Sequence, residues 1–447
     1  MNSRLARFSL PEHLRDKIGS ARKLCVAFSG GLDSTVLLAA LAKLRENLPD
    51  LQLRALHIHH GLSPLADSWV AHCQTLCARH HIAFSAIYVQ VNAQDGGIEA
   101  AARTARYQAF ADNLTEDEVL LTAQHLNDQC ETLMLALKRG SGPAGLSAMS
   151  ADSMASQHRL LRPLLELSRE QLEDYARQNQ LSWIEDDSNQ DARFDRNFLR
   201  LDVLPLLYHR WPHFAQATAR SAALCAEQES LLDELLSESL SALTDAQGSL
   251  CVEGMLGFSE ARRSALLRRW LAGQGAKMPS REQLKRVWDE VARSREDAQA
   301  QLRLGISTVR RFRQRLYLLP EFQPLKELIL CWDTAQTLTL PDGLGFLAVD
   351  PDVAGAGETF ICRQPRAGEN VSVRFQAQGN IEKVGRDRAR QAKKLWSELG
   401  VPPWQRERIP LIYYNDQLIA APGWFITRQA VAGNHDAQWR IVWSAAK

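Results

Sequence analysis

The residues Ser29-Gly30-Gly31-Leu32-Asp33-Ser34 have types and spacing suited to holding a chain of phosphates. They lie between an apolar run typical of a strand, 24–28, and an apolar run typical of a helix, 35–44. Paired glycines permit a tight turn close to a ligand, and the start of a helix offers unpaired N–H groups to an anion. The serine hydroxyls add two donors. All six residues are therefore predicted to bind the phosphates of a nucleotide.

Asp33 distinguishes this loop from other phosphate loops. The loop has neither the Gly-Lys-Ser/Thr ending of the Walker motif nor the G-x-G-x-x-G of dinucleotide folds. A carboxylate beside a polyphosphate repels it unless a divalent cation lies between them. Asp33 is therefore predicted to be a magnesium ligand. The alternative is an ordinary strand-to-helix turn in which Asp33 and Ser34 cap the helix.

Two further sets of polar residues lie near predicted strand ends. His57 falls near the end of a predicted strand, 53–59, and is expected to line the adenine pocket. Arg103 and Arg106 share one face of a predicted helix, 98–113. Two guanidinium groups on one face can hold phosphate oxygens, whereas a surface ion-pair ladder would contribute little. A catalytic role is predicted for at least one of the two arginines.

A dense group of titratable side chains follows the predicted strand 119–122. His125, Asp128 and Glu131 lie at the start of a predicted helix, 128–138, and capping would explain only one of them. His125 and Asp128 are therefore candidates for proton transfer, and Glu131 for contact with a substrate.

Basic residues follow in two places. Lys138 and Arg139 end the same helix and lead into a glycine-rich stretch, which predicts a lid or an RNA contact. Farther on, arginines at helical spacing follow the acidic turn 185–189. They form either a phosphate-reading edge or a helix complemented by that turn, and both interpretations stay open. The candidates there are Arg196, Asn197 and Arg200.

The first 215 residues alternate between strand-like and helix-like runs. The strand-like runs are 53–59, 83–91 and 119–122, and the helix-like runs are 68–80, 98–113 and 128–138. This alternation predicts an α/β domain with a doubly wound parallel sheet over residues 1–215. In such folds ligands bind at the carboxyl ends of the strands, where the candidate residues lie.

Length and composition predict two or three domains outside a membrane. The chain has 447 residues, 45% of them hydrophobic, and a net charge of +1. No apolar run approaches the roughly 20 residues needed to span a bilayer, so no membrane partner and a cytoplasmic location are expected. Of eight scattered cysteines, Cys73 and Cys77 lie one helical turn apart and are expected to be buried thiols.

Charge changes sign beyond residue 215. Residues 225–260 carry acidic side chains and no Lys or Arg, which predicts an acidic helical connector. Residues 257–316 contain 15 Lys plus Arg against 6 Asp plus Glu, a net charge of +9. Concentrated positive charge is typical of a nucleic-acid partner, although a solvated basic face is the alternative. A helical, basic RNA-binding domain is predicted over 216–325, with Arg268 and Arg269 among its contacts.

Residues 326–447 predict a small α+β domain. Hairpins are expected at 338–343 and 411–421, and Trp439, Ile441 and Trp443 alternate as in a strand. A basic helix is predicted over 386–399, closed by Gly400. Basic residues interleaved with tryptophans can bind the RNA backbone and stack on bases, although core tryptophans explain the pattern as well.

The phosphate loop resembles that of the PP-loop ATP pyrophosphatases, which cleave ATP to AMP and pyrophosphate. Six motifs over about 170 residues resemble one branch, the tRNA(Ile)-lysidine synthase family. They are the loop, H-x-H-H-G-L from His57, E-A-A-A-R-x-x-R-Y from Glu99, H-L-x-D-Q-x-E-T from His125, K-R-G-S-G from Lys138, and D-x-S-N to R-N-x-x-R from Asp186 to Arg200. Asn127 departs from the family's usual aspartate, and Gln124 from a common histidine.

The resemblance implies a ligase that uses ATP and Mg²⁺. It would join L-lysine to C2 of the wobble cytidine in the CAU anticodon of tRNA(Ile), through an adenylated cytidine, giving lysidine, AMP and pyrophosphate. The implied catalytic residues are Asp33, Arg103, Arg106, His125 and Asp128. The residues implied to contact tRNA or lysine are Glu131, Lys138, Arg139, Arg196, Asn197, Arg200, Arg268 and Arg269.

Two other functions remain open on the sequence alone. A PP-loop tRNA thiolase would use Cys73, Cys77 or Cys130, and a nucleotide-regulated RNA-binding protein would have no catalytic step. The resemblance also implies a C-terminal tRNA-binding domain over 326–447. The oligomeric state stays open, with a homodimer among the options.

Overall fold

The computed structural model describes residues 8–61, 63–91, 98–295, 298–350, 361–377, 379–386, 388–433 and 436–444. The chain divides into two compact units, residues 1–235 and 236–447. The side chains of residues 98–100, 187 and 188 lie outside the described part, so Glu99 of the predicted helix face is not placed.

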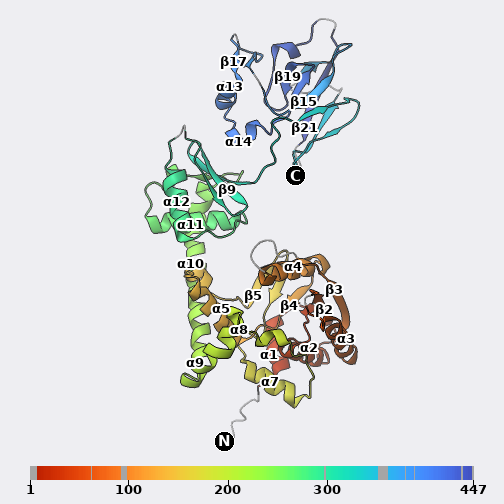
Figure 1. Ribbon diagram of the computed structural model, residues 1–447, viewed down its shortest axis with the longest axis vertical. Helices are drawn as coiled ribbons and strands as arrows, with labels where there is room; N and C mark the ends of the chain where they lie inside the picture. The colour runs from red at the N-terminus through yellow and green to blue at the C-terminus, as the bar shows by residue number, and fades with distance from the viewer. Residues whose placement is uncertain are drawn as a thin grey trace. The chain divides into compact units, whose positions relative to one another are not determined.

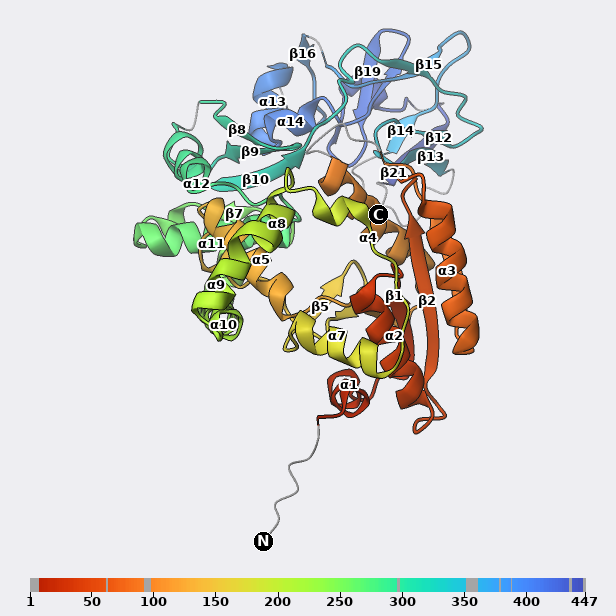
Figure 2. The same ribbon diagram turned by 60° about the horizontal axis from the view of Figure 1, so that its bottom comes forward.

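A six-stranded sheet organises the first unit (Figures 1 and 2). Its strands are β1 (Lys23–Ala27), β2 (Gln52–His59), β3 (Ala83–Tyr88), β4 (Val119–Leu121), β5 (Asp152–Ala155) and β6 (His158–Leu161), in the order β3-β2-β1-β4-β6-β5. All neighbours run parallel except β5, which pairs antiparallel with β6. The predicted parallel sheet is confirmed. The β5–β6 hairpin was not predicted, since its strands are only four residues long.

Helices cover both faces of this sheet because side chains alternate along each strand. Leu24 and Val26 pack into one core with α1 (Leu10–Ile18), α2 (Leu32–Arg45), α3 (Ala66–Arg79) and α7 (Arg169–Gln178). Cys25 and Leu120 point to the opposite core, which holds Phe110 of α4 (Ile98–Asn113). This two-sided cover is the doubly wound arrangement expected from the sequence.

The rest of the first unit is helical. It comprises α5 (Leu126–Lys138), α6 (Pro143–Leu146), η1 (Asp187–Gln190), α8 (Asp195–Phe198), the π-helical turn η2 (Leu199–Val203), α9 (Leu204–Arg210) and the part of α10 (Phe214–Leu243) up to residue 235. Leu126 and Cys130 of α5 pack against Leu204 and Ala215. α5 also contacts α8, and it carries the predicted titratable residues.

The basic part of the second unit combines helices with a sheet. It contains β7 (Leu250–Cys251), η3 (Glu253–Met255), α11 (Glu260–Gly273), α12 (Arg281–Arg286), η4 (Val287–Ala292), β8 (Gln301–Leu304), β9 (Ser307–Phe312) and β10 (Arg315–Pro320). Helices were predicted here, and 260–292 bears this out. Residues 301–320 instead form antiparallel strands, in which Leu302, Leu304 and Val309 alternate into the core. Gly305 and Arg313 take positive φ angles at the two turns.

The C-terminal part is built mainly from short antiparallel strands. These are β11 (Ile329–Cys331), β12 (Leu338–Thr339), β13 (Phe346–Asp350), β14 (Ile361–Arg363), β15 (Val371–Arg374), β16 (Asn380–Ile381), β17 (Arg390–Gln391), β18 (Leu411–Tyr414), β19 (Gln417–Ala421), β20 (Phe425–Ile426) and β21 (Gln438–Ser444). Two further helices are α13 (Ala392–Glu398) and α14 (Pro403–Arg406), and the last 3-10 turn is η5 (Arg428–Ala430). The predicted hairpins are confirmed as β12–β13 and β18–β19.

The predicted basic helix over 386–399 is shorter than expected. It begins at Ala392, because Arg390 and Gln391 form the strand β17 that pairs with β16. Gly400 follows with a φ of +77°, as predicted for the residue after a helix end. Trp396 is buried in the core, whereas Trp404 lies partly exposed.

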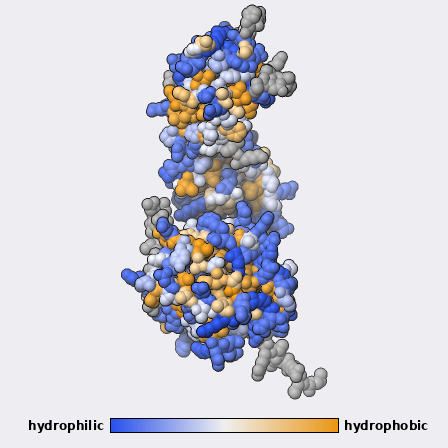
Figure 3. Space-filling model, turned by 90° about the vertical axis from the view of Figure 1, so that its right-hand side faces the viewer, coloured by the Kyte–Doolittle hydropathy of each residue, from blue (hydrophilic) through white to orange (hydrophobic). Residues whose placement is uncertain are grey.

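No helix among the described residues is long and apolar enough to cross a membrane. Hydrophilic side chains are spread over much of the face seen in Figure 3, with apolar side chains between them.

Candidate active site

The loop between β1 and α2 is held by its own serines and backbone. The hydroxyls of Ser29 and Ser34 lie 3.1 Å apart, and the Gly31 N–H donates to Ser29 Oγ at 3.3 Å. Ser34 Oγ also donates to the Gly31 carbonyl at 3.1 Å. Gly31 is the N-cap of α2 and supplies no side-chain cap, so the first N–H groups of this 14-residue helix stay available to an anion. The loop keeps the features of a phosphate site.

Gly30 is required at its position for two reasons. Its φ is +84°, and a Cβ there would lie 2.6 Å from Ile184 Cδ1 and 2.7 Å from Cys73 Sγ. The Ile184 N–H also donates to the Gly30 carbonyl at 2.9 Å. The back of the loop is therefore in contact with two residues that are distant in sequence.

Gly30→Ala is expected to destabilise the first unit by about 2–5 kcal/mol, because left-handed strain and overpacking add. Gly19→Ala is the matched control, since Gly19 has a φ of +56° and a Cβ added to it would meet nothing within 4 Å. It should cost only about 1–2 kcal/mol. Urea unfolding of the full chain, followed by tryptophan fluorescence, measures both. Equal unfolding midpoints for the two variants would show that the side chains of Ile184 and Cys73 move to make room for the added methyl group.

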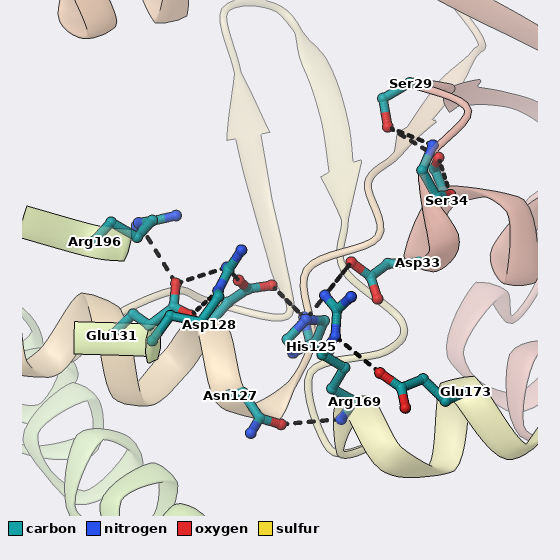
Figure 4. A network of polar contacts seen from close by, with 12 residues as sticks. Ser29, Asp33, Ser34, His125, Asn127, Asp128, Glu131, Arg169, Glu173 and Arg196 are labelled. Atoms are coloured by element: carbon teal, nitrogen blue, oxygen red, sulfur yellow. Dashed lines mark hydrogen bonds and ion pairs between the residues drawn. The ribbon is translucent and has the colours of Figure 1, made fainter. Parts of the chain in front are cut away.

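Asp33 points from the start of α2 toward His125 and Arg169 (Figure 4). Its Oδ2 lies 3.7 Å from His125 Nε2 and 3.7 Å from Arg169 Nη1. Burial raises the pKa of Asp33, and the nearby His125 and Arg169 oppose that shift. Its Oδ1 is buried without a hydrogen-bond partner. A buried carboxylate oxygen with no donor fits a cation ligand.

His125 and Asp128 are fixed by the helix that they begin. His125 is the N-cap of α5, and its N–H donates to Asp128 Oδ2 at 3.0 Å, as in a capping box. The His125 ring is 1% exposed, its Nε2 lies 3.5 Å from Asp128 Oδ2, and neither ring nitrogen has a hydrogen-bond partner. The structure thus brings Asp33 together with His125 and Asp128, which lie far from it in the sequence.

Arginines from the segment after η1 neutralise the carboxylates of α5. Arg200 donates to Glu131 at 2.7 and 3.0 Å and to Asp128 at 3.2 Å. Arg196 Nε lies 3.7 Å from Glu131, and its Nη2 donates to Thr132 at 3.3 Å. Burial raises the pKa of Glu131, and Arg200 opposes this shift. Glu131 is 1% exposed and holds Arg196 and Arg200, and its predicted contact with tRNA or lysine stays a prediction.

Arg169 was missed by the sequence analysis. It begins α7, and its guanidinium lies between Asp33 and Glu173, with Nε 3.2 Å from Glu173 (Figure 4). The capping box of Ser168 and Gln171 marks the start of this helix in the sequence, but no motif marks the arginine. We call the following set the charged cluster: Asp33, His125, Asp128, Glu131, Arg169, Arg196 and Arg200.

Asn127, the departure from the usual aspartate, points away from Asp33. Its Oδ1 accepts a hydrogen bond of 3.0 Å from the backbone N–H of Arg169 (Figure 4). An aspartate oxygen could accept the same bond. The amide therefore replaces the carboxylate in a task that tolerates both, which is to hold the start of α7 beside α5.

Asn127→Asp is expected to change lysine incorporation by no more than about twofold, because the acceptor for Arg169 is kept. Asn127→Leu should destabilise the first unit by about 1–3 kcal/mol and lower activity, since the Arg169 N–H loses its partner. Labelled lysine on tRNA and a thermal unfolding midpoint measure both effects. A larger loss of ATP affinity in Asn127→Asp than in Asn127→Leu would instead place the amide on the nucleotide.

The side chain of His57 is buried near the carboxyl end of β2. It is 5% exposed, and its Nδ1 lies 2.9 Å from the Phe28 carbonyl. Burial lowers the pKa of His57, so a neutral ring donates from Nδ1 to that carbonyl. Its side chain therefore joins the ends of β1 and β2, and its predicted contact with adenine stays a prediction.

The two arginines of α4 have other described partners. Arg103 lies 5.2 Å from the Tyr107 ring centroid, and Arg106 Nε donates to His60 Nε2 at 3.4 Å. Burial lowers the pKa of His60 to about 4, and the positive charge of Arg106 adds to this shift. The His60 ring is therefore neutral and accepts the hydrogen bond. The catalytic role of both arginines stays a prediction.

The other residues predicted to contact tRNA or lysine either lie on the surface or donate to backbone carbonyls. Lys138 pairs with Asp195 at 2.5 Å on the surface, and Arg139 is exposed at the end of α5. Asn197 donates to the Asp191 carbonyl at 3.0 Å. In the second unit, Arg268 and Arg269 donate to the carbonyls of Pro279 and Ala265. These residues keep their predicted roles as untested contacts.

The three cysteines that a thiolase would use, Cys73, Cys77 and Cys130, are buried. Burial raises the pKa of Cys73 and of Cys77 to about 12, and it raises that of Cys130. A protonated thiol is a poor nucleophile and metal ligand. Within the described residues, no group of three or more His, Cys, Asp or Glu side chains is arranged to hold a metal ion.

Comparisons with known proteins cover most of the chain. Residues 4–207 match a PP-loop domain, 250–317 a TilS substrate binding domain, and 371–443 a TilS substrate C-terminal domain. A tRNA(Ile)-lysidine synthase from Serratia proteamaculans is 61% identical over 97% of this chain and 98% of its own. Those from Edwardsiella ictaluri and Pectobacterium atrosepticum are 56% and 58% identical, over 97% and 94% of this chain and 98% and 94% of their own.

A solved U34-tRNA thiolase from Methanococcus maripaludis is 14% identical, with a TM-score of 0.42 over 49% of this chain and 78% of its own. That likeness is too weak to bear on activity. The full-length relatives decide the matter, and the family predicted from six motifs is confirmed: the chain belongs to the tRNA(Ile)-lysidine synthase family.

Proposed function

We propose that this protein ligates L-lysine to C2 of the wobble cytidine in the CAU anticodon of tRNA(Ile). The observation that carries the proposal is the charged cluster beside the phosphate loop, in which Asp33 lies 3.7 Å from the ring of His125. Nucleotide, base and amine would meet at one sheet edge there. The PP-loop domain and the name of the relatives support the use of ATP and tRNA(Ile).

In the first step, ATP lies with its phosphates on the loop from Ser29 to Ser34. The C2 carbonyl oxygen of the cytidine attacks the α-phosphorus, the bond to the β-phosphate breaks, and pyrophosphate leaves with the electron pair. The open N–H groups at the start of α2 stabilise the negative charge on the phosphates. Arg169 and Arg200 are nearby cations that can stabilise part of that negative charge.

In the second step, lysine displaces AMP from C2. Its ε-amino group has a reference pKa of ~10.4 and reacts only as the neutral amine, so it must lose a proton. Asp128 and His125 are the candidate acceptors. Asp128 is buried, and Arg200 and His125 hold its two oxygens in place. The amine then forms the C–N bond, and the C2–O bond to AMP breaks.

Asp33 would hold Mg²⁺ through its partnerless Oδ1. Magnesium is often bound by one or two carboxylates together with substrate phosphates, which agrees with a single carboxylate at this loop. When bound, the ion neutralises phosphate charge and supports the departure of pyrophosphate. The local task of Asp33 is to present an ionised oxygen beside the loop.

Three regions would share the work. Residues 1–215 form the catalytic domain, and residues 216–325 and 326–447 bind tRNA. Contacts with tRNA or lysine are proposed for the exposed cations Lys138 and Arg139 and for the arginines of the charged cluster. The cytoplasm, where ATP, lysine and tRNA occur together, is the proposed location.

The decisive experiment mixes the purified chain with magnesium-ATP, radiolabelled lysine and tRNA(Ile) that bears a CAU anticodon. We expect stable label in the anticodon fragment with one AMP released per lysine. AMP released without lysine label would point to another nucleophile such as sulfur. No AMP at all would favour a nucleotide-regulated RNA-binding protein.

A further inference from the structure

A basic pocket lies in the second unit. Its volume is about 690 Å³, within the range of small-molecule sites. Its walls are residues 298–301, Arg310, Arg311, Phe312, Gln391, Lys393, Lys394, Ser397, Pro403, Trp404 and Arg406. Five of these carry positive charge, and no acidic side chain lines the pocket among the described residues. We call it the basic pocket.

Two donors in the basic pocket are buried without partners. Trp404 Nε1 and Arg310 Nε are inaccessible to solvent and make no hydrogen bond. Leaving a buried donor unpaired is unfavourable, so such groups usually have a partner that is a ligand, an ion or water. The Arg310 guanidinium lies 5.9 Å from the Trp404 ring centroid, which places both donors at the same wall. A guanidinium beside an indole ring is suited to pair with a phosphate while a base stacks on the ring.

Aromatic rings stand next to these donors. Trp404 contacts Phe312 and Tyr317, with ring centroids 6.1 and 5.2 Å apart. Lys393 and Lys394 are exposed at the start of α13, and burial lowers the pKa of Arg406. Aromatic rings beside a row of cations are typical of sites for single-stranded nucleic acid, where bases stack and phosphates pair with charges. A neighbouring pocket contains an acidic side chain, because Glu321 lines it and pairs with Arg303 at 3.2 Å.

We propose that the basic pocket binds one unpaired nucleotide of RNA. Its phosphate would pair with the Arg310 guanidinium, its base would pack against the aromatic rings, and the flanking phosphates would pair with Lys393 and Lys394. The pocket would therefore select a single-stranded segment of the substrate and not a duplex. This inference rests on the proposed function, which supplies the RNA, and adds a second place where that RNA is held.

Cross-linking locates the bound nucleotide directly. The full chain is irradiated with a short single-stranded RNA that contains 5-iodouridine, and cross-linked peptides are identified by mass spectrometry. We expect cross-links at Trp404, Phe312 or Tyr317, and their loss with a blunt duplex of the same sequence. Cross-links confined to residues 1–235 would overturn the proposal. So would elimination of the RNA cross-links by micromolar AMP, because the pocket would then be a mononucleotide site.

Variants test the energetic contribution. Trp404→Ala should weaken tRNA binding about tenfold or more, and Trp404→Phe, which keeps a ring but removes the N–H, should weaken it less. Lys393→Gln with Lys394→Gln is a surface change that should not disturb folding. It should raise KM for tRNA with kcat unchanged and lower the salt slope of binding by about 1–2.

Arg366→Gln is the matched control, since Arg366 is an exposed cation of the same unit that pairs with Asp436 outside the pocket. It should leave the salt slope within about 0.5 of the parent. Equal slopes and equal affinities for all variants would refute the basic pocket. Failure of the wild-type chain to incorporate lysine would refute the proposed function and leave the cross-linking result standing.

Discussion

Asp33→Asn is expected to reduce tRNA-dependent release of pyrophosphate and AMP by about a thousandfold or more, equivalent to about 4 kcal/mol of barrier. The amide keeps the shape of the side chain but loses the charge that the buried Oδ1 offers to a cation. Affinity for tRNA should stay within about threefold, because the backbone and cation contacts that dominate it are untouched. Pyrophosphate release and tRNA binding are measured on the same preparation.

Stability separates this effect from misfolding. Burial raises the pKa of Asp33 in the folded protein above its unfolded value, so its contribution to stability is full at low pH and is lost as pH rises through the folded pKa. Asp33→Asn removes this loss of stability at high pH, because the amide does not titrate. The variant should unfold at the same or a higher temperature than the parent at pH 8, and the difference should vanish toward pH 4.

Asp67→Asn is the control for Asp33→Asn, since Asp67 is an exposed carboxylate near the end of β2 that lies 3.2 Å from His59. It should leave pyrophosphate release unchanged. An Asp33→Asn variant with more than about a tenth of the parent activity would remove Asp33 as a magnesium ligand.

Asp128→Asn is expected to slow lysine incorporation about a hundredfold at neutral pH, a usual effect of losing a general base. Pyrophosphate release should fall less than about tenfold, because the first step needs no proton from the amine. The remaining amide oxygen can still accept the His125 N–H that caps α5. Rapid-quench assays of pyrophosphate and of labelled lysine on tRNA distinguish the two steps.

The pH profile identifies the cause. In Asp128→Asn only lysine that is already neutral reacts, so incorporation should rise about tenfold per pH unit between pH 7 and 9. The control is Asp195→Asn on α8, whose carboxylate pairs with Lys138 at the surface. Undiminished incorporation in a folded Asp128→Asn variant would exclude Asp128 and leave His125 as the remaining candidate.

Local pattern sufficed for the phosphate loop and for the presence of α5, although the helix was predicted from residue 128 and begins at Leu126. Strand, paired glycines and helix follow one another without a break around Gly30, and His125 and Asp128 are joined by a single capping box. Such features depend on neighbours in the sequence, which is why the positions and the element types could be predicted together.

Long-range contacts could not be predicted in the same way. Arg169 reaches Asp33 only because α7 packs against α2, and Asn127 matters only because its side chain reaches the start of α7. The strands over 301–320 were missed because Arg residues interrupt their alternation, whereas the apolar side chains that remain pack against α11 and α12. Tertiary packing decided both cases.

The contact of Gly30 with Cys73 and Ile184 limits how this loop can be transplanted. A graft of residues 29–34 alone into another α/β scaffold would lack the side chains that pack against the turn. The backbone of the loop would then relax, and its N–H groups would no longer be positioned for a phosphate. A successful graft would carry the helix around Cys73 and the strap around Ile184 as well. For the same reason, larger and smaller side chains at those two positions should replace each other in compensating pairs over evolution.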